Sequence, residues 1–195
     1  ILARVDACRD RLDRVGPLLQ RFRQSVLASA MSGSLTGDSS ARRGHDRWGE
    51  ALLGELGAVS GGLTKNAKRE SLPMRRPYLR VANVHANRLD LSDVGEIGVS
   101  EAEFQKTRLV AGDLLIVEGN GSEDEIGRCA VWSGQISDCV FQNHLIRVRC
   151  FDPACVQFLK LFLNSPSGTD EMKRLAITTS GLYNLYTGAI TGIFH

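Results

Sequence analysis

The first thirty residues carry apolar side chains at alternating spacings of four and three. The positions are Ile1, Val5, Cys8, Leu12, Val15, Leu19, Phe22 and Val26. This heptad seam predicts a coiled-coil-type helix that needs a partner, because a single apolar stripe is unstable when it faces water. Pro17 lacks an amide hydrogen and disfavours helix at the preceding residue, so we expect a break or kink at Gly16-Pro17. A second helix then runs to about Ala30, with Gly33 as its cap.

The pattern changes after this arm, which covers residues 1–35. Residues 36–47 are rich in Gly, Ser and charged side chains and predict a linker. From Trp48 onward, apolar residues gather in short β-favouring runs bounded by Gly and Asp. The expected strands are Tyr78–Val84, Asp113–Glu118, Arg128–Trp132 and His144–Cys150. Two helices are expected later, over Pro153–Asn164 with Asp152 as N-cap residue and over about Ser167–Leu175.

These elements predict an α+β chain, in which a mixed, β-rich domain over residues 48–195 follows the helical arm. A length of 195 residues suits one domain with an appended element. No apolar run approaches the length of a membrane span, and the first residues lack the layout of a signal peptide. We therefore expect a cytoplasmic protein without a membrane partner.

No pattern in the chain indicates a catalytic centre. The five prolines never form the Pro-Pro pair that an amino-group DNA methyltransferase uses to hold a flipped base. The Gly-containing stretch Glu118–Ser122 is followed by acidic residues rather than by an apolar helix start, which indicates a turn. No nucleophile elbow is present, and the five cysteines include no C-x-x-C pair. We expect no catalytic residue, no cofactor and no metal site.

Several stretches, in the same order along the chain, resemble the specificity subunits of type I restriction–modification systems. They are Leu18–Leu27 with Ser32–Thr36, then Pro77–Val84, Gly112–Ser122, Phe141–Arg149 and Thr179–Leu185. The first resembles the end of the conserved helical spacer of that family, and the others resemble one target recognition domain. A complete subunit of the family has two of each, so the antiparallel partner of the heptad seam is missing here. Either the chain is a fragment, or it takes this helix from another copy.

The resemblance implies a DNA-reading role without catalysis. Each recognition domain of the family reads one half of a split target, and the spacer sets the distance between the halves. The implied partners are double-stranded DNA, methyltransferase subunits, a restriction and translocase subunit, and a second recognition half. That half is either in the same polypeptide or in a homodimer partner.

Residue type and position predict which side chains contact phosphates, which contact bases and which contact a partner protein. Six basic residues and one acidic residue lie between Lys65 and Arg80, in a chain with a net charge of only +2. Basic side chains in this segment are candidates for phosphate contacts, namely Lys65, Lys68, Arg69, Arg75 and Arg76. Amide, hydroxyl and imidazole groups in the family-like stretches are candidates for base contacts, namely Asn120, Ser122, Gln142, Asn143, His144, Ser180 and Asn184. Candidates for the partner interface on the arm are Val5, Leu12, Val15, Leu19, Phe22, Arg23 and Val26.

Alternative interpretations remain for the single residues and for the whole chain. The basic segment has the alternative role of a solvated loop, and a polar residue such as Asn143 or His144 has that of a structural hydrogen-bonding group. The loop from Gly61 to Arg76, which is less family-like, is an alternative source of base discrimination. The whole chain has the alternative of a protein-interaction module that dimerises through its arm, which predicts no salt-dependent affinity for DNA.

Overall fold

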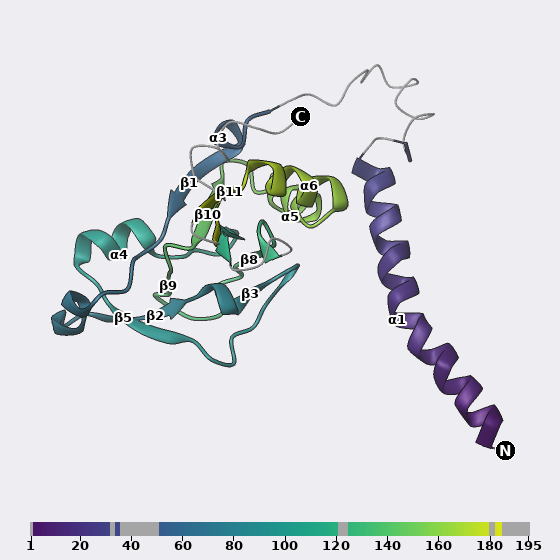
Figure 1. The fold of residues 1–195 in the computed structure, drawn as a ribbon. Helices are drawn as coiled ribbons and strands as arrows, with labels where there is room; N and C mark the ends of the chain where they lie inside the picture. The colour runs from purple at the N-terminus through teal and green to yellow at the C-terminus, as the bar shows by residue number, and fades with distance from the viewer. Residues whose placement is uncertain (1, 32–33, 36–50, 121–124, 180–181, 185–195) are drawn as a thin grey trace. The chain divides into compact units, whose positions relative to one another are not determined.

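The computed structural model describes residues 2–31, 34–35, 51–120, 125–179 and 182–184 (Figure 1). The chain divides into two compact units, Ile1–Trp48 and Gly49–His195, and each is described by itself.

The first unit contains one long helix, α1, over Leu2–Met31. Pro17 lies inside it, so the structure has a continuous helix where a break at Gly16-Pro17 and a second helix were predicted. Pro17 removes one amide donor, and the carbonyl that loses its partner lies on a helix whose side chains around this point are exposed to water. Two donors, Ser34 Oγ and the amide of Leu35, meet the carbonyl of Ser29 near the C-terminal end. Gly33, the expected cap, is outside the described residues.

The second unit is organised around a four-stranded antiparallel sheet in the order β1-β10-β6-β8. The strands are β1 (Gly57–Gly61), β10 (Leu145–Cys150), β6 (Leu114–Val117) and β8 (Cys129–Val131). All four side chains of β6 are fully buried, so this strand has apolar packing on both faces.

Two cores lie on the two faces of this sheet. Leu114 and Ile116 pack with residues of α5 (Cys155–Leu163) and α6 (Pro166–Leu175). Leu115 and Val117 pack with the second core, which includes Trp132 and Phe141. Figure 1 shows α5 and α6 together beside the sheet, well away from α4.

Smaller sheets surround this centre. The first has the order β5-β2-β9, with β5 (Gly95–Gly98) antiparallel and β9 (Val140–Phe141) parallel to β2 (Arg75–Leu79). The second has the order β11-β12-β7, and β3 with β4 forms a hairpin. The remaining bounds are α3 (Leu53–Leu56), η1 (Ala67–Ser71), η2 (Val81–Asn83), β3 (Val84–His85), β4 (Arg88–Leu89), α4 (Glu101–Thr107), β7 (Gly119–Asn120), β11 (Ile177–Thr179) and β12 (Leu182–Asn184).

The predicted α+β class is confirmed, and β6, β8 and β10 fall within three of the four predicted strands. The fourth, Tyr78–Val84, was wrong beyond Leu79, where the chain turns into η2. The buried amide of Asn83 causes this turn. It accepts from the amide of Arg80 at 2.8 Å and donates to the carbonyls of Asp90 and Asp93 at 2.9 and 2.8 Å.

The starts of the last two helices also differ from expectation. Asp152 lies before the helix rather than at its N-cap, which is Ala154, although the Asp152 carboxylate accepts from the Ala154 amide at 2.9 Å. Helix α6 begins at Pro166, and the hydroxyl of Ser165 accepts from the amide of Gly168. Proline is compatible with this first helical position because no hydrogen bond is required of its nitrogen there.

Replacement of Asn83 by Ala tests the turn. We expect Asn83→Ala to lower the free energy of unfolding by about 2 kcal/mol or more, because three backbone groups lose their partner. Chemical denaturation measures the change. Asn66→Ala is the matched control, since Asn66 is exposed and its side chain bonds to no described residue. Equal stability of the two variants would contradict the role given to Asn83.

Candidate nucleic-acid interface

A polar turn, Gln142–His144, joins β9 to β10. The amide of Leu145 donates to the carbonyl of Gln142 at 2.9 Å and closes the turn. Three further backbone bonds attach it to the rest of the domain. They run from Glu118 N to the His144 carbonyl at 2.9 Å, from Asn143 N to the Leu63 carbonyl at 3.1 Å and from Gln142 N to the Leu79 carbonyl at 2.9 Å. The turn is therefore held between the end of β6 and the chain that leads into the basic segment.

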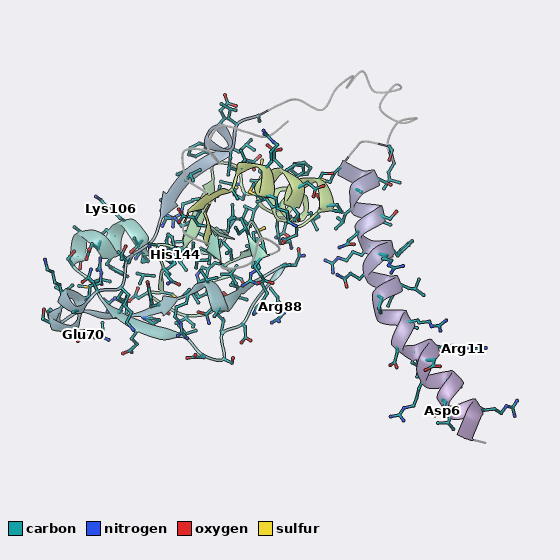
Figure 2. All side chains as sticks on the ribbon, in the orientation of Figure 1. Asp6, Arg11, Glu70, Arg88, Lys106 and His144 are labelled. Atoms are coloured by element: carbon teal, nitrogen blue, oxygen red, sulfur yellow. The ribbon has the colours of Figure 1, made fainter. Side chains whose placement is uncertain are left out.

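The side chains of this turn differ in their bonding. The carbonyl oxygen of the Gln142 amide accepts from the backbone amide of Val81 at 3.1 Å, which orients this side chain. The side chains of Asn143 and His144 are half-buried and form no hydrogen bond with a described residue. Figure 2 shows His144 in the central part of the domain. The donors and acceptors of Asn143 and His144 are therefore unused within the described part of the chain.

The small sheet brings two more candidates beside this turn. Strand β12 pairs with β7 in antiparallel register, with Tyr183 opposite Asn120 and Asn184 opposite Gly119. Glu118 precedes β7 directly and bonds to the turn through its amide. Three segments that are distant in the sequence thus meet at one end of the main sheet. Ser122 and Ser180 lie outside the described residues.

Glu118 is a functional candidate that sequence reasoning missed, because its neighbours indicated only a turn. Burial raises the pKa of its carboxyl group to about 7. No ion pair to Glu118 is formed by a described residue. A carboxyl group beside an amide-rich turn is suited to accept a hydrogen bond from a base amino group.

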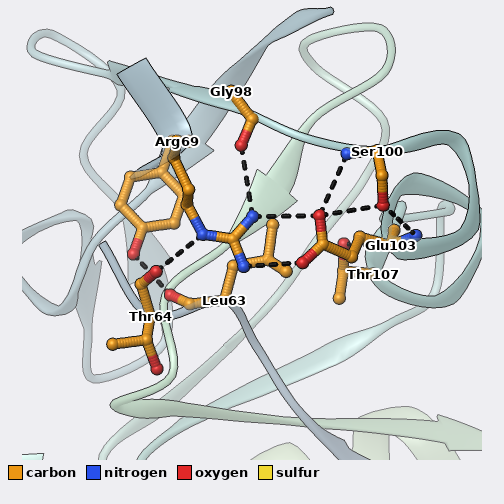
Figure 3. Close-up of polar contacts among 8 residues, drawn as sticks. Leu63, Thr64, Arg69, Gly98, Ser100, Glu103 and Thr107 are labelled. Atoms are coloured by element: carbon orange, nitrogen blue, oxygen red, sulfur yellow. Dashed lines mark hydrogen bonds and ion pairs between the residues drawn. The ribbon is translucent and has the colours of Figure 1, made fainter. Parts of the chain in front are cut away.

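Arg69 has an internal role rather than a free guanidinium (Figure 3). It donates from Nε to the Thr64 carbonyl at 2.8 Å and from Nη1 to the Gly98 carbonyl at 3.2 Å. Nη1 and Nη2 also bind the two carboxylate oxygens of Glu103 at 3.0 and 2.8 Å. Its side chain is 13% exposed. Arg69 thereby fixes the basic segment to α4, and the predicted phosphate contact competes with hydrogen bonds that its guanidinium already makes within the fold.

The other basic candidates have more open surroundings. Lys65, Lys68 and Arg75 are exposed. Arg76 is half-buried, and its Cζ lies 4.7 Å from the centre of the Phe104 ring. Leu63 lies just before this segment, and its carbonyl accepts from the Tyr78 hydroxyl at 2.7 Å and from the amide of Asn143. One anchored residue therefore joins the basic segment to the polar turn.

The seam of α1 presents large apolar side chains to water. Their exposed fractions run from 41% at Val26 to 70% at Leu12. Val5, Val15, Leu19 and Phe22 fall between these values, and Arg23 is exposed beside them. A stripe of this size on one helix is typical of a surface that packs against another helix.

The described residues offer neither a metal centre nor a membrane-spanning helix. They contain no group of three or more His, Cys, Asp or Glu side chains placed to hold a metal ion. No helix in the described part of the chain combines the length and the apolar character needed to cross a membrane.

Solved structures show the class of fold. A chain from a study of complex assembly and conformational transition of the type I R-M system superposes with a TM-score of 0.54 at 15% identity. The match covers 99% of this chain and 45% of that chain. The HsdS subunit from Thermoanaerobacter tengcongensis has a TM-score of 0.51 at 18% identity, over 94% of this chain and 44% of its own. The fold is therefore that found in type I restriction–modification subunits.

Sequence comparison finds similarity to two specificity subunits. The type I restriction enzyme EcoKI specificity subunit of Escherichia coli is 32% identical over 93% of this chain. The StySPI specificity subunit of Salmonella potsdam is 30% identical over 99%. No family model matches the chain. The chain spans 39% and 42% of the length of these two relatives and is similar to that part of each.

The Arg69–Glu103 pair gives a pH-dependent prediction. The hydrogen bonds from Arg69, followed by that from the Ser100 amide, lower the pKa of Glu103 from 4.5 to about 2. A lowered carboxyl pKa stabilises the fold above pH 4.5, and the contribution is lost as the pH falls toward 2. We expect Glu103→Gln to lower the thermal midpoint at neutral pH, by an amount that shrinks below pH 4.5. Glu101→Gln, an exposed change on the same helix, is the control, and a gap independent of pH would contradict this assignment.

Glu118 predicts the opposite dependence of stability on pH. Its carboxyl pKa is raised from 4.5 to about 7, so the ionised form opposes folding above pH 7 and the penalty disappears below pH 4.5. Glu118→Gln should therefore raise the free energy of unfolding by about 1 kcal/mol at pH 8, after allowance for solvent screening, and change it little at pH 4. Denaturant titrations at both values test this. Glu96→Gln, at an exposed site, is expected to show no such difference.

Proposed function

We propose that this chain recognises one half of a bipartite target in double-stranded DNA and directs partner methyltransferase and restriction subunits to it. The observation that carries this proposal is the 30–32% identity to two specificity subunits over 93–99% of the chain. Recognition takes place without catalysis in this chain, which needs no cofactor for it. A cytoplasmic location follows from this function, because the DNA of a bacterial host lies there.

The geometry of the interface supports a division between affinity and sequence reading. Lys65, Lys68 and Arg75 are exposed cations on a segment that follows the anchored Leu63. Such cations bind phosphates and contribute affinity that falls with salt. The polar turn attached to the same Leu63 offers amide and imidazole groups, which suit base edges in the major groove. A duplex that lies along the basic segment is therefore brought to the turn.

The arm supports the assembly part of the proposal. The apolar seam of α1 requires a helical partner, which the second half of a longer polypeptide or a homodimer partner would supply. Arg23, exposed beside the seam, is a candidate contact for a methyltransferase subunit. The same seam favours the second candidate function, an interaction module that dimerises through α1 and reads no DNA.

Mapping of methylated adenines tests the proposal. The chain is co-expressed with the methyltransferase subunit encoded beside it, and the host genome is then sequenced for methylation. We expect methylation at one bipartite motif, with a loss of at least about tenfold when Lys65, Lys68 and Arg75 are all changed to Glu, since three phosphate contacts become repulsive.

Arg174→Gln, an exposed change on α6, is the control for the loss of a surface charge. Methylation that persists unchanged in the triple variant, while the complex still assembles, would place DNA recognition outside this segment. A complex that assembles through α1 but never methylates a defined motif would favour the interaction module.

A further inference from the structure

The C-terminal end of α4 lies among four arginines. Arg108 directly follows the helix, and its carbonyl accepts from Arg147 Nη1 and from Arg149 Nη2, both at 3.1 Å. The Arg108 side chain lies over the Phe104 ring, with Cζ 5.8 Å from the ring centre, and Arg76 lies over the same ring at 4.7 Å. Strands β2 and β10 and helix α4 thus contribute guanidinium groups to one region.

The positive charge of this region is balanced only in part. Asp113 is fully buried and accepts two hydrogen bonds from Arg149, Nε to Oδ1 at 2.7 Å and Nη2 to Oδ2 at 2.8 Å. Among the described residues, Arg76, Arg108 and Arg147 form no ion pair. Of these three, Arg147 is buried, and a buried cation without a directly bound counter-ion is costly, which favours an anion from outside the chain.

Three polar atoms in the same region have no partner within the described structure. Arg147 is only 7% exposed, yet its Nε forms no hydrogen bond. The hydroxyl of Ser60, which lies opposite Arg147 in the β1–β10 register, and the Nε of Arg76 are also buried without a partner. Directly opposed residues in antiparallel strands place their side chains on the same face at close range. Native proteins rarely leave such groups unpaired. Each of these three atoms is shielded from the surface, so a buried water is the partner that fits it, and only the tips of the guanidinium groups can meet a larger ligand.

Aromatic rings hold these cations in place before any ligand arrives. Phe104 supports Arg76 and Arg108, and Phe141 supports Arg147, whose Cζ lies 5.6 Å from the ring centre. A guanidinium with a fixed plane loses little conformational freedom when it binds an oxyanion, and its fork of donors matches the oxygens of a phosphate.

We propose that the guanidinium groups of Arg76, Arg108 and Arg147 form a phosphate-binding site that holds the backbone of duplex DNA. The inference rests on the proposed function and extends it, because Arg108 and Arg147 lie outside the basic segment of residues 65–76. The DNA backbone offers successive phosphates, so the three guanidinium groups need not converge on one atom. The site supplies affinity and position rather than base discrimination.

Arg108→Gln is the most informative variant. The Arg108 side chain is exposed and forms no hydrogen bond with a described residue, and its structural carbonyl is kept in the variant. The full chain is titrated with a duplex of mixed sequence at salt concentrations from about 50 to 200 mM. We expect weaker binding, by roughly three- to tenfold at the lower salt, and a salt slope that is shallower by about 0.9 for the lost phosphate contact. The thermal midpoint should remain that of the wild type.

Two comparisons make the result decisive. Arg88→Gln removes an exposed arginine from the β3–β4 hairpin, and Figure 2 shows Arg88 well separated from Lys106 on α4. Equal losses in the Arg88 and Arg108 variants, or an unchanged slope for Arg108→Gln, overturn the site while salt-dependent DNA binding still supports the proposed function. Wild-type protein without any affinity for DNA overturns both.

A second experiment distinguishes binding of the DNA backbone from binding of free phosphate ions. Inorganic pyrophosphate is added to the wild type and to Arg108→Gln, and the thermal midpoint is recorded. A rise confined to the wild type, together with weaker DNA binding by the variant, supports the site. A rise confined to the wild type with unchanged DNA binding shows a site for free phosphate and overturns the DNA assignment.

Discussion

The burial of β6 on both faces is the constraint on which the domain depends. Leu114 and Ile116 join the core under α5 and α6, and Leu115 and Val117 join the core on the opposite face. Both faces of the strand are packed against apolar side chains. Its neighbours β8 and β10 must therefore pair with it in one register, since a slip of one residue exchanges the residues of the two faces. The residues on either side of β6 are therefore held in defined positions. Asp113 before it meets Arg149, and Glu118 after it meets the polar turn.

Hydrogen bonds at Leu63 fix the position of the exposed segment that follows it. Its amide donates to Phe141, and its carbonyl accepts from the Tyr78 hydroxyl and the Asn143 amide. The chain that follows it carries the exposed lysines, and Arg69 attaches that chain to α4 through Glu103. The charged segment is thereby attached to the domain at two points, Leu63 and Arg69. A surface that must meet both phosphates and base edges benefits from this, because a mobile loop would lose conformational entropy on binding.

Arginines in this domain divide by what their guanidinium groups contact. Arg69 and Arg149 bind carboxylates within the fold. Arg76, Arg108 and Arg147 rest on aromatic rings without an acidic partner among the described residues. The guanidinium groups of the first kind are neutralised within the fold, and those of the second kind are the ones that the proposed phosphate site would use. Residue type alone cannot separate the two, since both are arginines close to strands or turns.

The sequence by itself determined the heptad helix, the strands β6, β8 and β10, and the resemblance to specificity subunits. These follow from local spacing, from continuous apolar runs and from motifs in a fixed order, which need no knowledge of distant contacts. The tertiary structure alone decided which cations are free, because Arg69 meets Glu103 34 residues later and Arg147 meets Arg108 39 residues earlier. It also decided the meeting of Glu118, His144 and the β7–β12 pair, and the turn at Asn83 that ended a predicted strand. Each of these depends on a partner brought close only by folding, which the local pattern does not encode.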